Sequence, residues 1–248
     1  MLIDETKCVG CGRCSVYCPV GAHRFERTPE GKVYAVVDQE LCCECGVCLR
    51  AGVCEMDALY EPELEMPRLV RAILSNPLIE FKESGVPGRG TAEIKTNEIT
   101  GRVRYATAGV ALEMGRPGVS TKWTDVEVMT KALAKLGVGF CDENPVTYFM
   151  KDKKTGELKD EVRNERSLSA IIEFDCKLEE LPKVLEVIKE NIDKIDTVFS
   201  LDVACKIRPD GSIPVLSIID QAGFEVLMNT KNNMGLGRPR FREEGEPL

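Results

Sequence analysis

Hydrophobic residues in the second half of the chain follow two different periods. Strand-like runs rich in aliphatic residues cover 103–114, 138–151, 168–174 and 197–207. Between them, apolar residues recur every three or four positions over 123–136 and 179–192, which predicts two amphipathic helices. Thr124 is a candidate N-cap for the first of these helices.

The order of these elements is strand–helix–strand–strand–helix–strand. It predicts an α+β domain with the ferredoxin-like (βαββαβ) plait over residues 102–220, a name that describes a fold and implies no cluster. Residues 153–156 predict a turn, and Pro209-Asp210-Gly211 predicts another that leads into a strand over 213–219. A polar extension rich in Gly, Pro and Arg follows over 221–248.

Residues 61–101 predict a connector between two domains. Prolines and closely spaced glycines interrupt any long periodic pattern in this segment. A short helix is expected over 68–75, where Leu69, Val70, Ile73 and Leu74 fall on one side.

The first sixty residues form an internal repeat built around cysteine. Ile3–Cys8 matches Val37–Cys42 at an offset of 34, and the same offset relates the next two cysteines of each copy. It would carry Cys18 to Gly52, but the next cysteine is Cys54, so the second copy is two residues longer. After this step the copies realign, with Ala22 matching Ala58 and His23 matching Leu59.

The first copy reads Cys8-x2-Cys11-x2-Cys14-x3-Cys18-Pro19 and closely resembles the bacterial two-cluster ferredoxins. The resemblance covers residues 1–60 and implies a ferredoxin domain with two 4Fe–4S clusters. In that family the fourth cysteine of each motif binds the other cluster. The resemblance therefore implies that cluster one is held by Cys8, Cys11, Cys14 and Cys54, and cluster two by Cys42, Cys45, Cys48 and Cys18. No family resemblance is found for residues 61–248.

The second copy departs from the family pattern. Five residues rather than three separate Cys48 from Cys54, Glu55 replaces the usual proline, and Cys43 is an additional thiol. Cys43 is expected to be a bystander, because the Cys43-x-Cys45 step is too short for the usual ligand loop. Two four-cysteine zinc sites are the alternative interpretation of the region.

Gly10, Gly12 and Gly46 lie between the expected ligands, where the lack of a side chain lets backbone N–H groups approach the sulfurs and tune the potential. His23 is the single histidine of the chain and is expected to pack beside a cluster. Nucleophilic catalysis therefore has one candidate base, inside a cluster loop, and no catalytic residues are predicted.

The remaining cysteines and several arginines belong to the second half of the chain. Cys141, Cys176 and Cys205 are far apart and are expected to be small buried hydrophobes. Arg89, Arg116 and Arg238 stand in Gly/Pro loops. Solvated surface turns are the favoured interpretation of these loops, and binding of a phosphate, a carboxylate or an acidic surface is the alternative.

Composition narrows the functional classes. The chain has 248 residues, of which 43% are hydrophobic and 30% charged, as in an ordinary globular protein. A formal charge of −8 disfavours a broad nucleic-acid footprint. No apolar run approaches the roughly 20 residues of a membrane span, and the start of the chain lacks the pattern of a secretory signal. A reducing, cytoplasmic location is expected, where clustered cysteines bind metal.

The leading hypothesis is an electron-transfer protein or subunit that passes single low-potential electrons through two clusters to a partner redox enzyme. The second domain is expected to dock that partner or to form a homodimer. The alternatives are an oxidoreductase subunit whose C-terminal domain binds an anionic substrate or cofactor, and a redox-sensing regulator. The chain carries neither a P-loop nor a dinucleotide-binding fingerprint.

Overall fold

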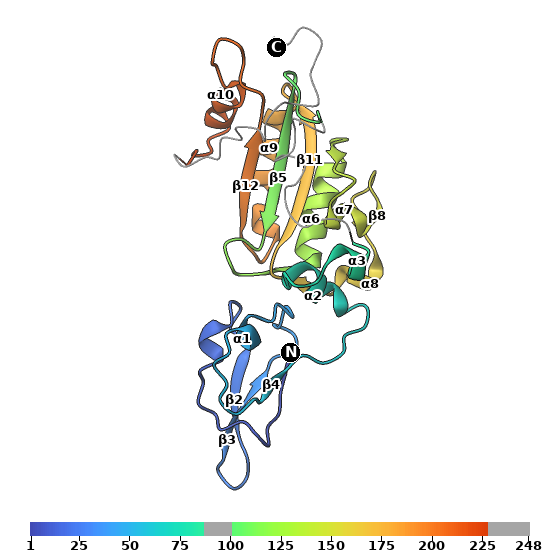
Figure 1. Cartoon of the computed structure of the whole chain (residues 1–248). Coiled ribbons are helices and arrows are strands. Elements are labelled where there is room, and N and C mark those ends of the chain that lie inside the picture. The colour runs from blue at the N-terminus through green and yellow to red at the C-terminus, as the bar shows by residue number, and fades with distance from the viewer. Residues whose placement is uncertain (87–100, 228–248) are drawn as a thin grey trace.

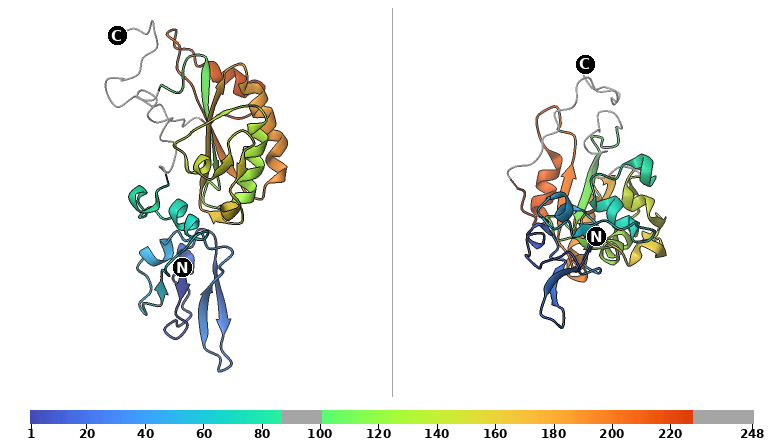
Figure 2. Two further views of the ribbon diagram at one scale, coloured as in Figure 1. Left: turned by 90° about the vertical axis from the view of Figure 1, so that its right-hand side faces the viewer. Right: turned by 60° about the horizontal axis from the view of Figure 1, so that its bottom comes forward.

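The computed structural model describes residues 1–86 and 101–227 and contains both helices and strands (Figure 1). The cysteine repeat forms one end of the molecule, and a larger part built on a four-stranded sheet forms the other (Figures 1 and 2). Arg89 and Arg238 lie outside the described residues, as do parts of the expected connector and C-terminal extension.

The N-terminal part consists of short elements around a small core. They are β1 (Leu2–Ile3), a 3-10 turn (Ser15–Tyr17), β2 (His23–Arg27), β3 (Val33–Val37), α1 (Val47–Arg50) and β4 (Leu59–Tyr60). Apart from cysteines, the fully buried hydrophobic residues of this core are Met1, Ala22 and Leu59. Such a small apolar core stabilises little by itself.

Backbone pairing in this part repeats with the sequence. β1 pairs with β4, and β2 pairs with β3, both antiparallel. Equivalent positions of the repeat meet in the two pairs. Leu2–Tyr60 corresponds to Val36–Arg24, and Ile3–Leu59 corresponds to Val37–His23. The Asp4 N–H donates to the Ala58 carbonyl at 2.8 Å, and the Asp38 N–H donates to the Ala22 carbonyl at 2.7 Å. The start of each copy is therefore bonded to the end of the other copy.

Two short helices follow the repeat. α2 (Leu69–Ser75) lies where the two parts of the molecule meet, and α3 (Phe81–Ser84) comes after it (Figure 1). The position of α2 agrees with the expected helix at 68–75. Its residues from Val70 to Ser75 are all buried, because both parts of the molecule pack against it.

The larger part is built on an antiparallel sheet with the strand order β12-β5-β11-β7. The strands are β5 (Thr107–Met114), β7 (Gly139–Phe140), β11 (Ala170–Lys177) and β12 (Phe199–Ala204). Along the chain, α6 (Trp123–Ala134) comes between β5 and β7, and α9 (Leu181–Asn191) between β11 and β12. Both helices cover the same face of the sheet (Figure 2).

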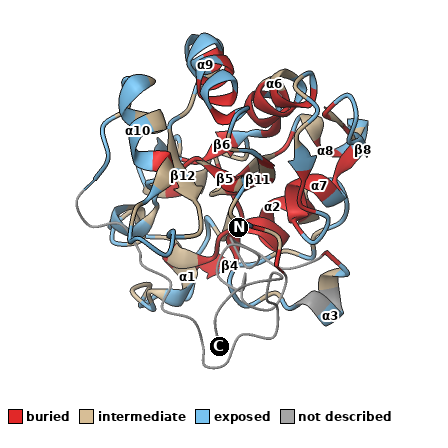
Figure 3. Cartoon of the chain, turned by 90° about the horizontal axis from the view of Figure 1, so that it is seen from above, coloured by how far each residue is buried: buried red, intermediate tan, exposed pale blue. Residues whose placement is uncertain are grey.

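Alternating side chains of the strands supply the core on that face. Val110, Leu112 and Met114 of β5 point the same way as Ile172 and Phe174 of β11, and all five are buried. In Figure 3 the side of α9 that faces the sheet is buried and its outer side is exposed, whereas α6 is buried along most of its length. Each large apolar side chain buried here contributes about 1.5–3 kcal/mol relative to an exposed one.

Smaller elements complete this part. They are β6 (Thr121–Lys122), α7 (Pro145–Tyr148), β8 (Met150–Asp152), β9 (Glu157–Leu158), α8 (Asp160–Arg163), β10 (Arg166–Ser167), a 3-10 turn (Ile192–Lys194) and α10 (Pro214–Gln221). Residues 153–156 form the expected turn, between β8 and β9. Among the described residues, none of the helices has the length and apolar character needed to cross a membrane.

Two expected strands are wrong. Instead of one strand over 138–151, the chain forms β7, α7 and β8, because Asn144 caps a helix by accepting the Val146 N–H at 2.8 Å and Pro145 occupies its first turn. Residues 213–219 belong largely to the helix α10 rather than to a strand. Val215 is buried in the core, and Ile218, Ile219 and Ala222 pack against it, a helical spacing.

The other predicted elements are present with shifted ends. Thr124 is not the N-cap of α6: Lys122 holds that position, with no side-chain cap. Cys141 and Cys176 are buried, and Cys205 packs partly buried against the core, as expected for small hydrophobes.

The turn between β8 and β9 is held tightly against α6. Substitutions at two glycines, one in this turn and one outside it, test the contact. Gly156 and Gly137 have nearly equal φ values of 70° and 71°. A Cβ on Gly156 would stand 2.3 Å from the Thr130 carbonyl oxygen, whereas one on Gly137 would meet nothing within 4 Å. We expect Gly156→Ala to lower the free energy of unfolding by about 1–3 kcal/mol more than Gly137→Ala does. Urea unfolding followed by the fluorescence of the single Trp123 measures the difference, and equal losses would contradict the packing described.

Candidate iron–sulfur centres

All twelve cysteines are free thiols, and the fold gathers eight of them into two sets. Cys14 belongs to the first set. Burial raises the pKa of its thiol, and the nearby thiols of Cys8, Cys11 and Cys54 raise it further. Three of these residues come from one loop, whereas Cys54 comes from the other copy of the repeat. The structure therefore brings together the four residues expected at cluster one.

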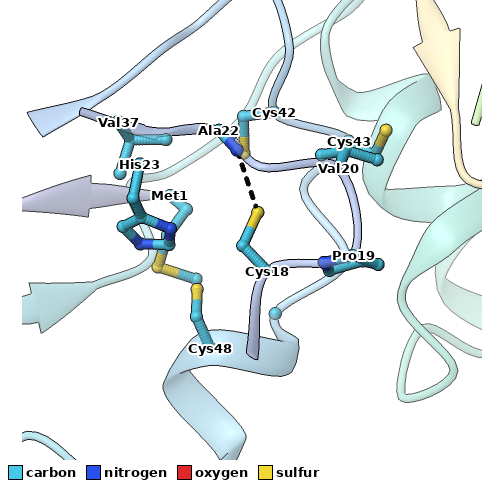
Figure 4. Close-up of a pocket in the computed structure, with 12 residues that line it drawn as sticks. Met1, Cys18, Pro19, Val20, Ala22, His23, Val37, Cys42, Cys43 and Cys48 are labelled. Carbon is cyan, nitrogen blue, oxygen red and sulfur yellow. Dashed lines mark hydrogen bonds between the residues drawn. The ribbon is translucent and has the colours of Figure 1, made fainter. Parts of the chain in front are cut away.

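The second set surrounds a small cavity. Cys18, Cys42, Cys45 and Cys48 all line it (Figure 4). Burial raises the pKa of Cys48 to about 12, with further contributions from Cys18, Cys45, Cys42 and Cys14. Cys18 thus lies with Cys42, Cys45 and Cys48 of the second copy. Cys14 of the first set is near enough to Cys48 to raise the pKa of the Cys48 thiol. The two sets are neighbours.

The two extra residues before Cys54 do not displace it. The chain absorbs them in the one-turn helix α1 and the bend at Gly52, whose φ is 63°. The Ala58 N–H then donates to the Cys54 sulfur at 3.3 Å, just as the Ala22 N–H donates to the Cys18 sulfur at 3.2 Å. Cys54 therefore occupies the position in its copy that Cys18 occupies in the other.

Backbone N–H groups also approach the Cys8 sulfur. Gly10 N–H donates to it at 3.4 Å and Ala35 N–H at 3.3 Å. A Cβ on Gly10 would lie 2.7 Å from the Val33 carbonyl oxygen, so only glycine fits where this loop meets β3. N–H donors to sulfur stabilise a thiolate and the negative charge of a cluster bound to it.

The donor chemistry fits iron–sulfur clusters. Each set offers four thiols, and thiolates are the ligands of 4Fe–4S clusters. Among the described residues, no three His, Cys, Asp or Glu side chains converge as the ligands of a single metal ion do. A cubane binds its four ligands through four different iron atoms, so its ligands need not converge on one point. Binding to iron removes the thiol protons despite the raised pKa values.

The two sets differ in exposure. Cys42, Cys45 and Cys48 are buried, whereas Cys11 is exposed. Exposed apolar side chains of Val9, Val16 and Tyr17 occupy the loop that carries the first set. Cluster one would thus face solvent, and cluster two the interior.

Two arginines bond the backbone of the second cysteine loop, and one of them, Arg71, also ties this loop to the larger part. From α2, Arg71 forms a buried ion pair with Glu165 and donates to the carbonyls of Gln39, Glu40 and Cys42 at 2.9, 3.3 and 2.9 Å. Arg50 donates to the Cys45 carbonyl at 2.8 Å. Arg68 and Arg71 were not among the predicted site residues, although two arginines in a short apolar helix directly after the repeat were a usable signal in the sequence.

A carboxylate is buried beside the same loop. Glu44 accepts from Arg68 at 2.6 Å and pairs with the amino group of Met1. Burial by itself would raise the pKa of Glu44, but the two cationic partners outweigh it and hold the pKa below its ordinary value. Glu44 therefore stays ionised, and its charge is compensated.

Cys43 points away from the sets. Its thiol interacts with the Ser120 side chain and the charge of Arg166, both in the larger part, and burial raises its pKa to about 12. The pKa of Cys48 is raised to a similar value. The expected cluster ligand Cys48 and the expected bystander Cys43 therefore differ in position and not in acidity. A role of Cys43 at the contact between the two parts fits its expected status as a bystander to the clusters.

Arg116 already has partners at the end of β5 and directly before β11. Its guanidinium donates to Glu113 at 2.8 Å and to the Ser169 hydroxyl at 2.9 Å, at the rim of a hollow that reaches Leu168 and Ile171. The carboxylate compensates its charge, so nothing here favours the anion site considered for this arginine.

Comparison with known proteins supports the binding of 4Fe–4S by the N-terminal segment. Residues 1–22 match the family described as "4Fe-4S binding domain". Over 59 residues, 24% of this chain, the sequence is 41% identical to an uncharacterized ferredoxin of Methanocaldococcus jannaschii and covers 73% of that protein. No solved structure matches the chain. Through its N-terminal segment, the chain belongs to the ferredoxins, which bind 4Fe–4S clusters and transfer electrons.

The crossing of ligands between copies can be tested with alanine variants. We expect Cys18→Ala to resemble Cys45→Ala in its electron paramagnetic resonance spectrum and to differ from Cys11→Ala, because Cys18 lies with the second set. Each of the three variants should retain about half of the iron. Cys43→Ala, the matched control beside a ligand, should retain all of it. A Cys18→Ala spectrum identical to that of Cys11→Ala would show that the crossing is absent.

Removing Arg71 tests the connection between the two parts. Arg71→Met leaves Glu165 buried without its partner, which costs about 3–5 kcal/mol of unfolding free energy for such a pair. Lys183→Met is the control, because it breaks an exposed pair with Glu186 and should cost less than about 1 kcal/mol. Urea unfolding monitored at Trp123 compares them. Equal effects would mean that Arg71 does not stabilise the larger part.

Proposed function

We propose that this protein carries single electrons at low potential through two 4Fe–4S clusters to a partner redox protein. Cluster one is bound by Cys8, Cys11, Cys14 and Cys54, and cluster two by Cys18, Cys42, Cys45 and Cys48. The observation that carries this proposal is the pair of neighbouring four-thiol sets, each completed by a cysteine from the other copy of the repeat.

Neighbouring clusters suit the transfer of one electron at a time. Cys14 of the first set lies close to Cys48 of the second, which provides a short path between the clusters. The formal charge of −8 disfavours the addition of an electron, so both potentials belong at the low end of the range from about −700 to +450 mV.

We infer that the larger part is a ferredoxin-like plait. Its chain order β5-α6-β7-β11-α9-β12, its antiparallel strand order β12-β5-β11-β7 and the placement of both helices on one face support this assignment. Through Arg71 it holds the loop of cluster two. We infer that it supports the cluster-bearing part and offers a further surface for association with a partner or a second copy.

A redox partner should approach cluster one. Cys11 is exposed there, and Val9, Val16 and Tyr17 offer an apolar surface next to it. By contrast, the second set is more enclosed, with Cys42, Cys45 and Cys48 buried. Apolar contact surfaces close to a redox centre suit small, transient protein interfaces. Homodimer formation through the larger part remains a separate prediction, to which the partly exposed strand β12 at the edge of the sheet is relevant.

Metal analysis of anaerobically purified full-length protein tests the proposal. We expect about eight iron and eight sulfide per chain, as two cubanes require, and a visible absorption that bleaches on chemical reduction and returns on oxidation. About four iron per chain would limit the protein to one cluster. Colourless protein with stoichiometric zinc would overturn the proposal.

A further inference from the structure

The side chain of His23 has an unusual environment. Both imidazole nitrogens are buried, and neither forms a hydrogen bond with any of the described residues. Buried polar groups are nearly always paired, because an unpaired donor loses its hydrogen bonds to water without compensation. A missing partner is therefore expected near this ring.

The surroundings of the ring indicate what that partner is. His23 begins β2 and lines the same cavity as Cys18, Cys42, Cys45 and Cys48. Figure 4 shows the imidazole beside Met1, on the same side of the cavity as Cys48 and across from Cys18. Apart from His23, every side chain that lines the cavity is apolar or carries sulfur. The group that these cysteines would bind is the natural acceptor for an imidazole N–H.

The repeat supplies an internal comparison. His23 pairs with Val37 in one strand pair, and Leu59 pairs with Ile3 at the equivalent place in the other. Leu59 is buried in the small core of the N-terminal part and has no polar hydrogen to donate. The two copies are thus alike in strand pairing here, and an imidazole stands at position 23 where a leucine stands at position 59.

We propose that His23 donates a hydrogen bond from its imidazole to a sulfur atom of cluster two and raises the reduction potential of that cluster. The inference rests on the proposed two-cluster function. Reduction adds negative charge to the cluster, and an N–H dipole directed at its sulfur stabilises that charge. The buried, apolar cavity strengthens the interaction because water does not screen it. Leu59 provides no such stabilisation at cluster one.

The single histidine allows a direct test. The full-length protein is produced with histidine carrying ¹⁵N only in the imidazole ring, so that every labelled nitrogen belongs to His23. After anaerobic reduction, pulsed electron paramagnetic resonance should detect a weak ¹⁵N coupling to a cluster. No coupling would overturn the inference, and so would a coupling as strong as that of an iron-bound nitrogen. The signal should vanish in His23→Leu, which installs the residue found at the equivalent position 59.

Redox titration provides the second readout. We expect His23→Leu to disfavour reduction of one cluster by roughly 3- to 10-fold, up to about 59 mV for one electron, and to leave the other cluster unchanged. His23→Gln keeps an N–H donor and should show a smaller shift. If both potentials stay at their original values, or if one becomes more positive in His23→Leu, the inference is wrong.

Iron analysis separates the two levels of the proposal. Suppose that the parent protein shows no ¹⁵N coupling and that His23→Leu still binds about eight iron per chain. This result would remove the role of His23 and leave the proposed electron-transfer function standing. Parent protein without iron–sulfur clusters would remove both.

Discussion

The hydrogen bonds that join the start of each repeat to the end of the other are the constraint on which this structure depends. Asp4 with Ala58 and Asp38 with Ala22 make each half complete only in the presence of its counterpart. Because Cys54 and Cys18 lie four residues before these alanines, the same pairing carries each of them to the other copy's loop. The two sets of thiols therefore form together, and neither copy can build a complete set alone.

A second constraint links this unit to the larger part. Arg71 is buried and uses one guanidinium for both sides, donating to the carbonyls of the second cysteine loop and pairing with Glu165. A buried charge requires such compensation, since its desolvation is costly. The environment of the second set is consequently shared between the two parts, while the first set stays open to solvent. This asymmetry accords with the proposal that a redox partner approaches the first set.

Most regular elements were predictable because their apolar residues recur with a clear period. β5, β11, α6 and α9 all form within a few residues of the expected ranges. The failures occurred where local capping competes with a short apolar run. At Asn144-Pro145 a cap starts a helix inside an expected strand, and at Pro214 a helix replaces a strand because Val215, Ile218 and Ala222 share one buried side. Short runs of apolar residues fit either period, so packing decides between them.

By itself, the sequence determined the chemistry of the candidate site: the number of thiols, their spacing and the family to which the N-terminal segment belongs. These follow from local spacing, since three cysteines in one loop need no distant partner to lie together. Only the tertiary structure decided how the longer second copy still places Cys54, why Cys43 turns toward Ser120, and that Arg71 joins the two parts. It also placed His23 in the cavity of the second set. These features depend on contacts between residues far apart in the chain, and such contacts leave no period or spacing in the sequence.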